Sequence, residues 1–381
     1  MLESSNRGLT LVKSLIFLVP SLSIATVILG HEISNHKNEF LLKEAASIEL
    51  SENDRDVDTY FDKSSDAILL VDRRNGRLRE WHWKTGAKTE WVTIDASPCL
   101  SRGGLAVDSV LPMHKMPYLI ITICGSVEIA DKTALPVLKK LTSIPVTDAL
   151  QVVLSPDERS LAVVERQERG TPKQEDLVKI YRTADWTLTT QWRMSSQGAN
   201  LNFTPDGKSV VTFFGGNLYD RCGFISYDLL SGRITKEWNF DKSSADCPNF
   251  LFSIFAKKSG TSVFGKVEGS GSIVEWDLDR ERVVNSFPDD VPQPSHVSSF
   301  SFSTDQRLMG VNSVASSEGS SNMEYATQIW DVQTGNKIYE KSLHDCYNPM
   351  VSATFLLNSN HVMVRYPAKI AIFEYSTAQS R

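Results

Sequence analysis

The chain has 381 residues, of which 41% are hydrophobic and 23% charged, with a formal net charge of −6 and a sequence pI near 5.7. These fractions are typical of a folded globular protein and argue against a disordered chain. An acidic chain has no general attraction for phosphate backbones, so the composition argues against nucleic acid as a partner.

The first element in chain order is an apolar, uncharged segment, Ser14 to Gly30, which follows Arg7 and Lys13 and precedes a polar run. This arrangement is typical of an export or anchoring signal. We expect residues 1–30 to be a signal anchor or signal peptide, and residues 31–45 to be a polar linker.

Two alternatives remain open for this segment. A membrane-spanning helix needs roughly 20 apolar residues, and the stretch from Leu9 to Gly30 reaches that length only by including Lys13. A cleaved signal needs small residues at the cut, which Ser23-Ile24-Ala25 supplies. Under either alternative, the positive residues on the N-terminal side place the remaining chain outside the cytoplasm. We therefore expect a membrane-anchored or secreted protein.

The rest of the chain is built from repeats. An aromatic or aliphatic residue followed by a polar residue and a turn recurs at intervals of 43 to 54 residues. The seven positions, which we call the anchors, are Trp81, Ile129, Tyr181, Tyr227, Trp276, Trp330 and Phe373. A repeat at this period is typical of a closed or stacked repeat architecture, so we expect seven units in one domain, residues 46–381.

The clearest unit runs from Ala199 to Asn239 and reads as four short strands. A strand at Leu201 to Phe203 is followed by the turn Thr-Pro-Asp-Gly-Lys and a second strand at Ser209 to Phe214; two further strands surround the turn Leu230-Ser231-Gly232. Pro-Asp-Gly supplies the fixed and the permissive backbone angles that a tight turn needs. Four-stranded antiparallel units repeated at this period predict an all-β fold, a β-propeller with seven blades.

The same residues carry a family resemblance. Trp276-Asp277, Trp330-Asp331 and, less closely, Tyr227-Asp228 occur with the turns Ser-Pro-Asp-Glu, Thr-Pro-Asp-Gly-Lys and Ser-Thr-Asp-Gln. Through them, residues 48 to 381 resemble the WD-repeat propeller family. The family often places a Gly-His pair before each unit, and here only His296 and His344 lie near that position, without the glycine. The absence of this pair affects the expectation of the family's buried polar network, but it does not affect the expectation of the blade fold.

Closure of the ring is predicted from the two ends of the propeller. The last unit contains three strands, ending near Tyr375, and therefore lacks one. Ala46 to Ser51 alternates apolar and polar residues, and we expect it to supply the missing strand. Such a closure removes the free sheet edges that could template aggregation.

Strand order assigns each connection to one of two faces. Connections between the first and second strands, and between the third and fourth, are mostly tight and share one face, which we call the tight-turn face. All other connections share the opposite, long-loop face, and they include an expected loop from Arg166 to Leu177. Loops on a rigid scaffold frequently carry binding residues. Our candidate contact residues for a protein or peptide partner are aromatic or charged residues on the long-loop face: Tyr219, Asp220, Arg221, Asp289, Asp290, Tyr325 and Tyr347. The acidic pair of this set is expected to be solvated rather than to bind calcium.

Five cysteines are also expected on the long-loop face. Cys222 and Cys247 are 25 residues apart, as are Cys99 and Cys124, and both pairs are possible disulfides in an oxidising compartment. Free, buried thiols are the alternative, because sequence does not show Cα separations. Cys346 is the odd thiol.

No cofactor, metal site or catalytic set is expected. The eight tryptophans do not fit the Thr-Gly-Lys-x-x-Trp unit of quinone-dependent propellers, and blade packing explains them better. The histidines show no ligand spacing, and no nucleophile elbow or phosphate loop is present.

We expect a monomeric propeller that acts as a protein interaction scaffold rather than as an enzyme. The alternatives are a hydrolase, lyase or lactonase with a site at the channel mouth, and an envelope-assembly scaffold. The sequence does not identify the partner.

Overall fold

The computed structural model describes most of the chain. It describes residues 40–51, 57–63, 65–95, 106–133, 135, 137–168, 175–194, 201–214, 221–241, 248–257, 260–267, 272–288, 295–316, 323–343, 352–356, 359–366 and 368–377. The predicted signal at residues 1–30 lies outside them. None of the described residues forms a helix that is long and apolar enough to span a membrane.

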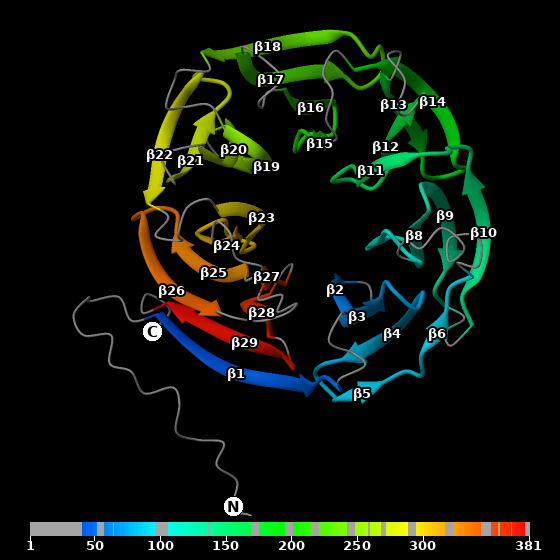
Figure 1. The fold of residues 1–381 in the computed structure, drawn as a ribbon, viewed down its shortest axis with the longest axis vertical. Helices are drawn as coiled ribbons and strands as arrows, with labels where there is room; N and C mark the ends of the chain where they lie inside the picture. Colours follow the sequence, from blue (N-terminus) through cyan, green and yellow to red (C-terminus); the bar gives the residue numbers. More distant parts are fainter. Residues whose placement is uncertain are drawn as a thin grey trace, which may run out of the picture.

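The described strands form seven antiparallel sheets, the blades, arranged around a ring (Figure 1). Blade 1 contains β2 (Val57–Asp62), β3 (Ala67–Asp72), β4 (Arg77–His82), β5 (Ala87–Lys88) and β6 (Val92–Thr93). Blade 2 contains β7 (Ser109–Pro112), β8 (Tyr118–Ile123), β9 (Ser126–Asp131) and β10 (Lys139–Ile144). Blade 3 contains β11 (Ala149–Leu154), β12 (Ser160–Gln167), β13 (Glu175–Arg182) and β14 (Thr187–Arg193). Blade 4 contains β15 (Leu201–Phe203), β16 (Ser209–Phe214), β17 (Arg221–Asp228) and β18 (Ile234–Asp241).

The remaining blades follow the same order. Blade 5 contains β19 (Pro248–Lys257), β20 (Gly260–Val267), β21 (Ser272–Asp277) and β22 (Arg282–Pro288). Blade 6 contains β23 (Ser295–Phe302), β24 (Leu308–Ser316), β25 (Met323–Asp331) and β26 (Asn336–Leu343). Blade 7 contains β27 (Ser352–Phe355), β28 (His361–Tyr366) and β29 (Lys369–Thr377), with β1 (Phe40–Glu49) paired to β29. The chain is a seven-bladed β-propeller.

Each predicted anchor lies on the third strand of its blade. All seven anchor side chains are buried, with exposed fractions between 0% at Ile129 and 6% at Phe373. In six blades the pairing of the third and fourth strands contains a β-bulge. This bulge lies next to the anchor or next to the residue opposite the anchor. The repeat period, the count of seven and the position of the anchors within each unit are therefore confirmed.

The apolar core is divided among the contacts between blades. The buried apolar residues of the described chain form seven clusters, and each cluster joins two neighbouring blades. Aromatic rings cross these contacts: the ring of Trp276 lies 6.0 Å from that of Phe224, and the ring of Trp330 lies 5.9 Å from that of Phe287. The prediction that tryptophans fill the wedges between blades is confirmed at these positions.

The two ends of the propeller meet in blade 7. β1 starts at Phe40, before the expected strand at Ala46, and pairs with β29 as the outermost strand. Ile48 is buried in the cluster between blades 7 and 1, where it lies with Trp81. The neighbouring Ser47 is exposed, as the alternation of a half-buried strand requires.

The hairpins of the long-loop face extend further than their sequence suggests. We expected a loop from Arg166 to Leu177, but β12 continues to Gln167 and β13 begins at Glu175. Arg166 lies opposite Asp176 in the register, and its guanidinium Nε lies 3.0 Å from Asp176 Oδ1. A cross-strand ion pair stabilises such an extension, which explains why charged residues continue the ladder here.

Glycine is required at the turns that follow two anchors. Gly232 and Gly335 occupy equivalent positions in blades 4 and 6, with φ of 65° and 71°. A Cβ on Gly232 would lie 2.8 Å from the Trp192 ring, whereas a Cβ on Gly335 would meet nothing within 4 Å. We expect Gly335→Ala to cost about 1–2 kcal/mol of unfolding free energy through backbone strain. Gly232→Ala should cost roughly 1–3 kcal/mol more through overpacking.

Denaturant unfolding of the two variants checks this prediction. Equal losses for both would show that Trp192 moves aside freely, and that the turn of blade 4 is not packed tightly on blade 3.

Candidate functional site

On the tight-turn face, three turns share one hydrogen-bond pattern. The hydroxyls of Ser155, Thr204 and Ser303 donate to the carboxylate two residues later, at 2.7, 2.7 and 2.6 Å. Each hydroxyl also accepts the backbone N–H five residues later, at 2.9 to 3.0 Å. The polar groups of these turns are therefore used to hold the turns themselves.

The aspartates after the anchor tryptophans have a similar role. Asp331 accepts the backbone N–H groups of Gln333 and Thr334, both at 3.0 Å, and Arg307 Nε donates to it at 3.1 Å. Asp277 likewise accepts two turn amides, at 3.0 and 2.9 Å. Both carboxylates are therefore satisfied largely within their own turns.

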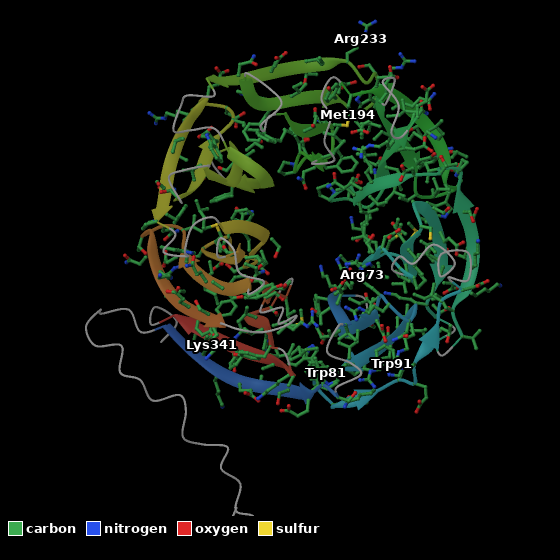
Figure 2. The ribbon with its side chains drawn as sticks, viewed as in Figure 1. Arg73, Trp81, Trp91, Met194, Arg233 and Lys341 are labelled. Atoms are coloured by element: carbon green, nitrogen blue, oxygen red, sulfur yellow. The ribbon has the colours of Figure 1, made fainter. Side chains whose placement is uncertain are left out.

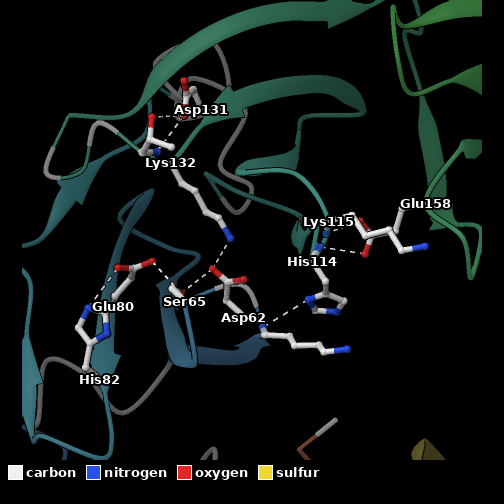
Figure 3. A network of polar contacts seen from close by, with 11 residues as sticks. Asp62, Ser65, Glu80, His82, His114, Lys115, Asp131, Lys132 and Glu158 are labelled. Carbon is white, nitrogen blue, oxygen red and sulfur yellow. Dashed lines mark hydrogen bonds and ion pairs between the residues drawn. The ribbon is translucent and has the colours of Figure 1, made fainter. Parts of the chain in front are cut away.

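A network of ionisable groups joins blades 1 and 2 (Figure 3). Lys132, which follows β9, forms a salt bridge with Asp62 at the end of β2, and their side chains are only 6% and 0% exposed. Ser65 Oγ donates to Asp62 at 2.7 Å and lies 3.4 Å from Glu80. Burial raises the pKa of Glu80 above its usual range, although the nearby His82 acts in the opposite direction. The buried salt bridge and the hydrogen bond from Ser65 therefore connect blade 1 to blade 2.

The network continues from blade 2 to blade 3. Glu158, in the turn between β11 and β12, has a φ of 60° and accepts the backbone N–H groups of His114 and Lys115 at 2.8 and 2.7 Å. Burial lowers the pKa of His114, and its Nδ1 accepts the Lys63 amide at 3.3 Å. A neutral imidazole is required for that acceptor.

Sequence reasoning missed this network, because its members are separated by 3 to 70 residues along the chain. The position of Asp62 and Lys132 at strand ends next to tight turns was the one available signal. That position along the chain does not show which blades contact each other.

Only two of the predicted contact residues lie within the described ranges. Arg221 begins β17, and Tyr325 lies half-buried in β25 opposite Val314 and Leu343. Both belong to third strands, near their long-loop ends, but in blades 4 and 6. The other predicted residues, Tyr219, Asp220, Asp289, Asp290 and Tyr347, lie outside the described residues.

The cysteines are described in part. Cys124 lies in the turn between β8 and β9, on the long-loop face, and is disulfide-bonded. Cys99, its predicted partner, lies outside the described residues, so the Cys99–Cys124 pairing stays a prediction. Cys247 and Cys346 also lie outside them, and for Cys222 only the backbone in β17 is described.

The described part of the long-loop face carries ion pairs that the sequence analysis did not single out. Arg73 donates to Asp58 at 3.3 Å and to the Val107 carbonyl at 3.1 Å, and Figure 2 shows Arg73 towards the centre of the ring. In blade 3, Lys179 lies 2.7 Å from Glu165. Within the described ranges, no three His, Cys, Asp or Glu side chains gather closely enough to hold a metal ion.

Comparison with known proteins supports the fold alone. No protein-family model matches the chain, and no curated protein matches it. A solved structure, "Kuenenia stuttgartiensis Hydrazine Synthase", is similar with a TM-score of 0.51 and 12% sequence identity, over 70% of this chain and 78% of that chain. At this identity the similarity extends to the propeller architecture and not to the activity in that protein's name.

Proposed function

We propose that the chain is an exported or membrane-anchored propeller that binds a protein or peptide partner through its long-loop face. The difference between the two faces supports this proposal most strongly. The described turns of the tight-turn face hold their own polar groups, whereas connections on the long-loop face vary from two residues, 124–125, to fifteen, 94–108. Variable connections on a rigid scaffold are where recognition usually resides.

Two further parts of the proposal rest on the sequence. The apolar segment from Ser14 to Gly30 would tether or export the propeller, with the propeller outside the cytoplasm. The Trp-Asp units and the Ser/Thr-x-Asp turns support a divergent relationship to WD-repeat propellers. Envelope assembly would be one setting for such a scaffold.

A pull-down from detergent-solubilised membranes tests the proposed face. A variant that combines Asp220→Ala, Arg221→Ala and Tyr325→Ala is expected to lose capture of the partner, because aromatic and arginine side chains dominate interface energies. The matched control combines Glu237→Ala and Lys341→Ala, which replace exposed residues on the outer strands of the same two blades.

The control is expected to capture the partner as the unchanged chain does. Thermal unfolding of both variants separates a lost contact from a lost fold, since Tyr325 is half-buried. Undiminished capture by a folded triple variant would rule out this part of the face.

A further inference from the structure

The exposed large aliphatic residues of the described chain are concentrated in one sector. We call the following set the aliphatic rim: Val137, Leu141, Leu188, Leu230 and Ile234, which are 67%, 41%, 46%, 84% and 51% exposed. All five lie in the connection before a fourth strand or at the start of that strand, in blades 2, 3 and 4. They therefore lie at the tight-turn end of the fourth strands of three consecutive blades. Figure 1 shows these strands, β10, β14 and β18, on the outer edge of the ring.

The positions opposite the anchors differ between sectors. Leu188 and Ile234 lie opposite the anchors of blades 3 and 4. The residues opposite the anchors of blades 1, 6 and 7 are charged: Lys88, Lys337 and Glu44. In blade 5 the residue is Val283, which is half-buried against the contact between blades 4 and 5, and in blade 2 it is Thr142. The aliphatic rim is thus a property of one sector and not of the repeat. Single exposed apolar residues are ordinary, but a concentration in one sector indicates a contact surface.

Packing brings together the parts of the aliphatic rim that lie in blades 3 and 4. The turn that carries Leu230 also carries Gly232, whose position lies against the Trp192 ring of β14, the strand that contains Leu188. Figure 2 shows Arg233, the next residue of this turn, on the outer edge of the ring.

The charge around the aliphatic rim is opposite to that of the chain. Residues 131–141, 182–188 and 228–237 contain six lysines and arginines against four aspartates and glutamates, in a chain whose net charge is −6. Lys132 is buried against Asp62. Lys140, Arg182 and Lys236 each form a salt bridge with a carboxylate. Arg233 precedes Ile234, and Lys139 lies two residues before Leu141 and opposite Asp131 in the register. Basic and large apolar side chains together are the composition of surfaces that rest on anionic lipid.

The direction of β1 relates the aliphatic rim to the N-terminal segment. Phe40, the first residue of β1, pairs with Thr377 at the end of β29, which is a third strand and ends at the tight-turn face. The chain before Phe40 therefore joins the propeller at the tight-turn face. Nine residues, 31–39, separate Phe40 from the apolar segment that ends at Gly30. A chain of that length spans at most roughly 30 Å.

We propose that the aliphatic rim, with Lys139 and Arg233, rests on the headgroup region of the lipid bilayer that the N-terminal segment enters. This inference rests on the proposed tethering. It fixes the orientation of the propeller: the tight-turn face lies towards the membrane, and the long-loop face points away from it, open to a partner.

Photo-crosslinking of the full-length chain in liposomes of mixed neutral and anionic lipid tests the orientation. A diazirine-bearing residue replaces Leu188, Leu230, Arg193 or Leu18, one per variant. Leu188 and Arg193 lie at opposite ends of the same strand, β14, so Arg193 is the matched control. Lipid adducts at 188 and 230 are expected to exceed those at 193 by roughly tenfold, because a surface-bound element enters the bilayer by only about 5–10 Å.

The outcomes separate the two proposals. Adducts at 18 without adducts at 188 and 230 would leave the tether standing and overturn the orientation. An absence of adducts at 18, 188 and 230 would overturn the tether and the orientation together. Crosslinks from 188 or 230 to a second copy of the chain would assign the aliphatic rim to self-association instead of lipid.

Discussion

Replacing Lys132 with methionine is expected to lower the free energy of unfolding by about 3–5 kcal/mol, because it leaves the Asp62 carboxylate buried without its counter-charge. Asp62 is completely buried, and its salt bridge with Lys132 is one of the contacts that join the end of β2 in blade 1 to blade 2. Ser65 would continue to donate to Asp62, but a neutral hydroxyl does not replace an ammonium group. Denaturant unfolding monitored by tryptophan fluorescence measures the loss.

Two variants show whether burial is the cause. Lys140→Met removes a lysine that pairs with Glu128 and is 53% exposed, so its cost is expected to stay below about 1 kcal/mol. The double variant Asp62→Asn, Lys132→Met buries no charge and is expected to recover part of the stability that Lys132→Met loses. If Lys132→Met and Lys140→Met cost the same, the buried pair does not hold blades 1 and 2 together.

Ile48→Asp is expected to open the contact between blades 7 and 1. Ile48 is 3% exposed and packs with Trp81, Ile68 and Ile370. The substitution removes a buried aliphatic side chain, which costs about 2–5 kcal/mol of unfolding free energy. It also buries a carboxylate that has no hydrogen-bond partner at the site, which costs roughly 1–3 kcal/mol more. Release of β1 would also expose the edge of β29, so aggregation is expected to accompany unfolding.

The adjacent substitution is the control for closure. Ser47→Asp introduces the same charge one residue earlier, on the exposed side of β1, where Ser47 hydrogen-bonds Glu44, and is expected to cost about 1 kcal/mol or less. Thermal unfolding and light scattering measure the two effects. An Ile48→Asp protein that unfolds like Ser47→Asp would show that β1 contributes little to holding the ring closed.

The candidate site was less predictable than the fold. Arginine and tyrosine are common in interfaces, which makes Arg221 and Tyr325 candidates, and their strands begin on the expected long-loop face. The sequence did not indicate that Arg166 and Asp176 would pair across β12 and β13 and shorten a connection expected to be a loop. Cross-strand contacts depend on register, which is set by the whole hairpin and not by local composition.

The number of blades and the location of their cores follow from the amino-acid pattern alone, because each unit must bury one large residue on its third strand and the turn residues mark where strands end. Trp81, Tyr181 and Trp330 show this in three different blades. Which distant residues meet depends on the folded ring: Lys132 meets Asp62, Phe40 pairs with Thr377, and the aliphatic residues of blades 2 to 4 lie along one edge. The physical reason is that contacts between blades follow from closing the ring, and no local pattern encodes them.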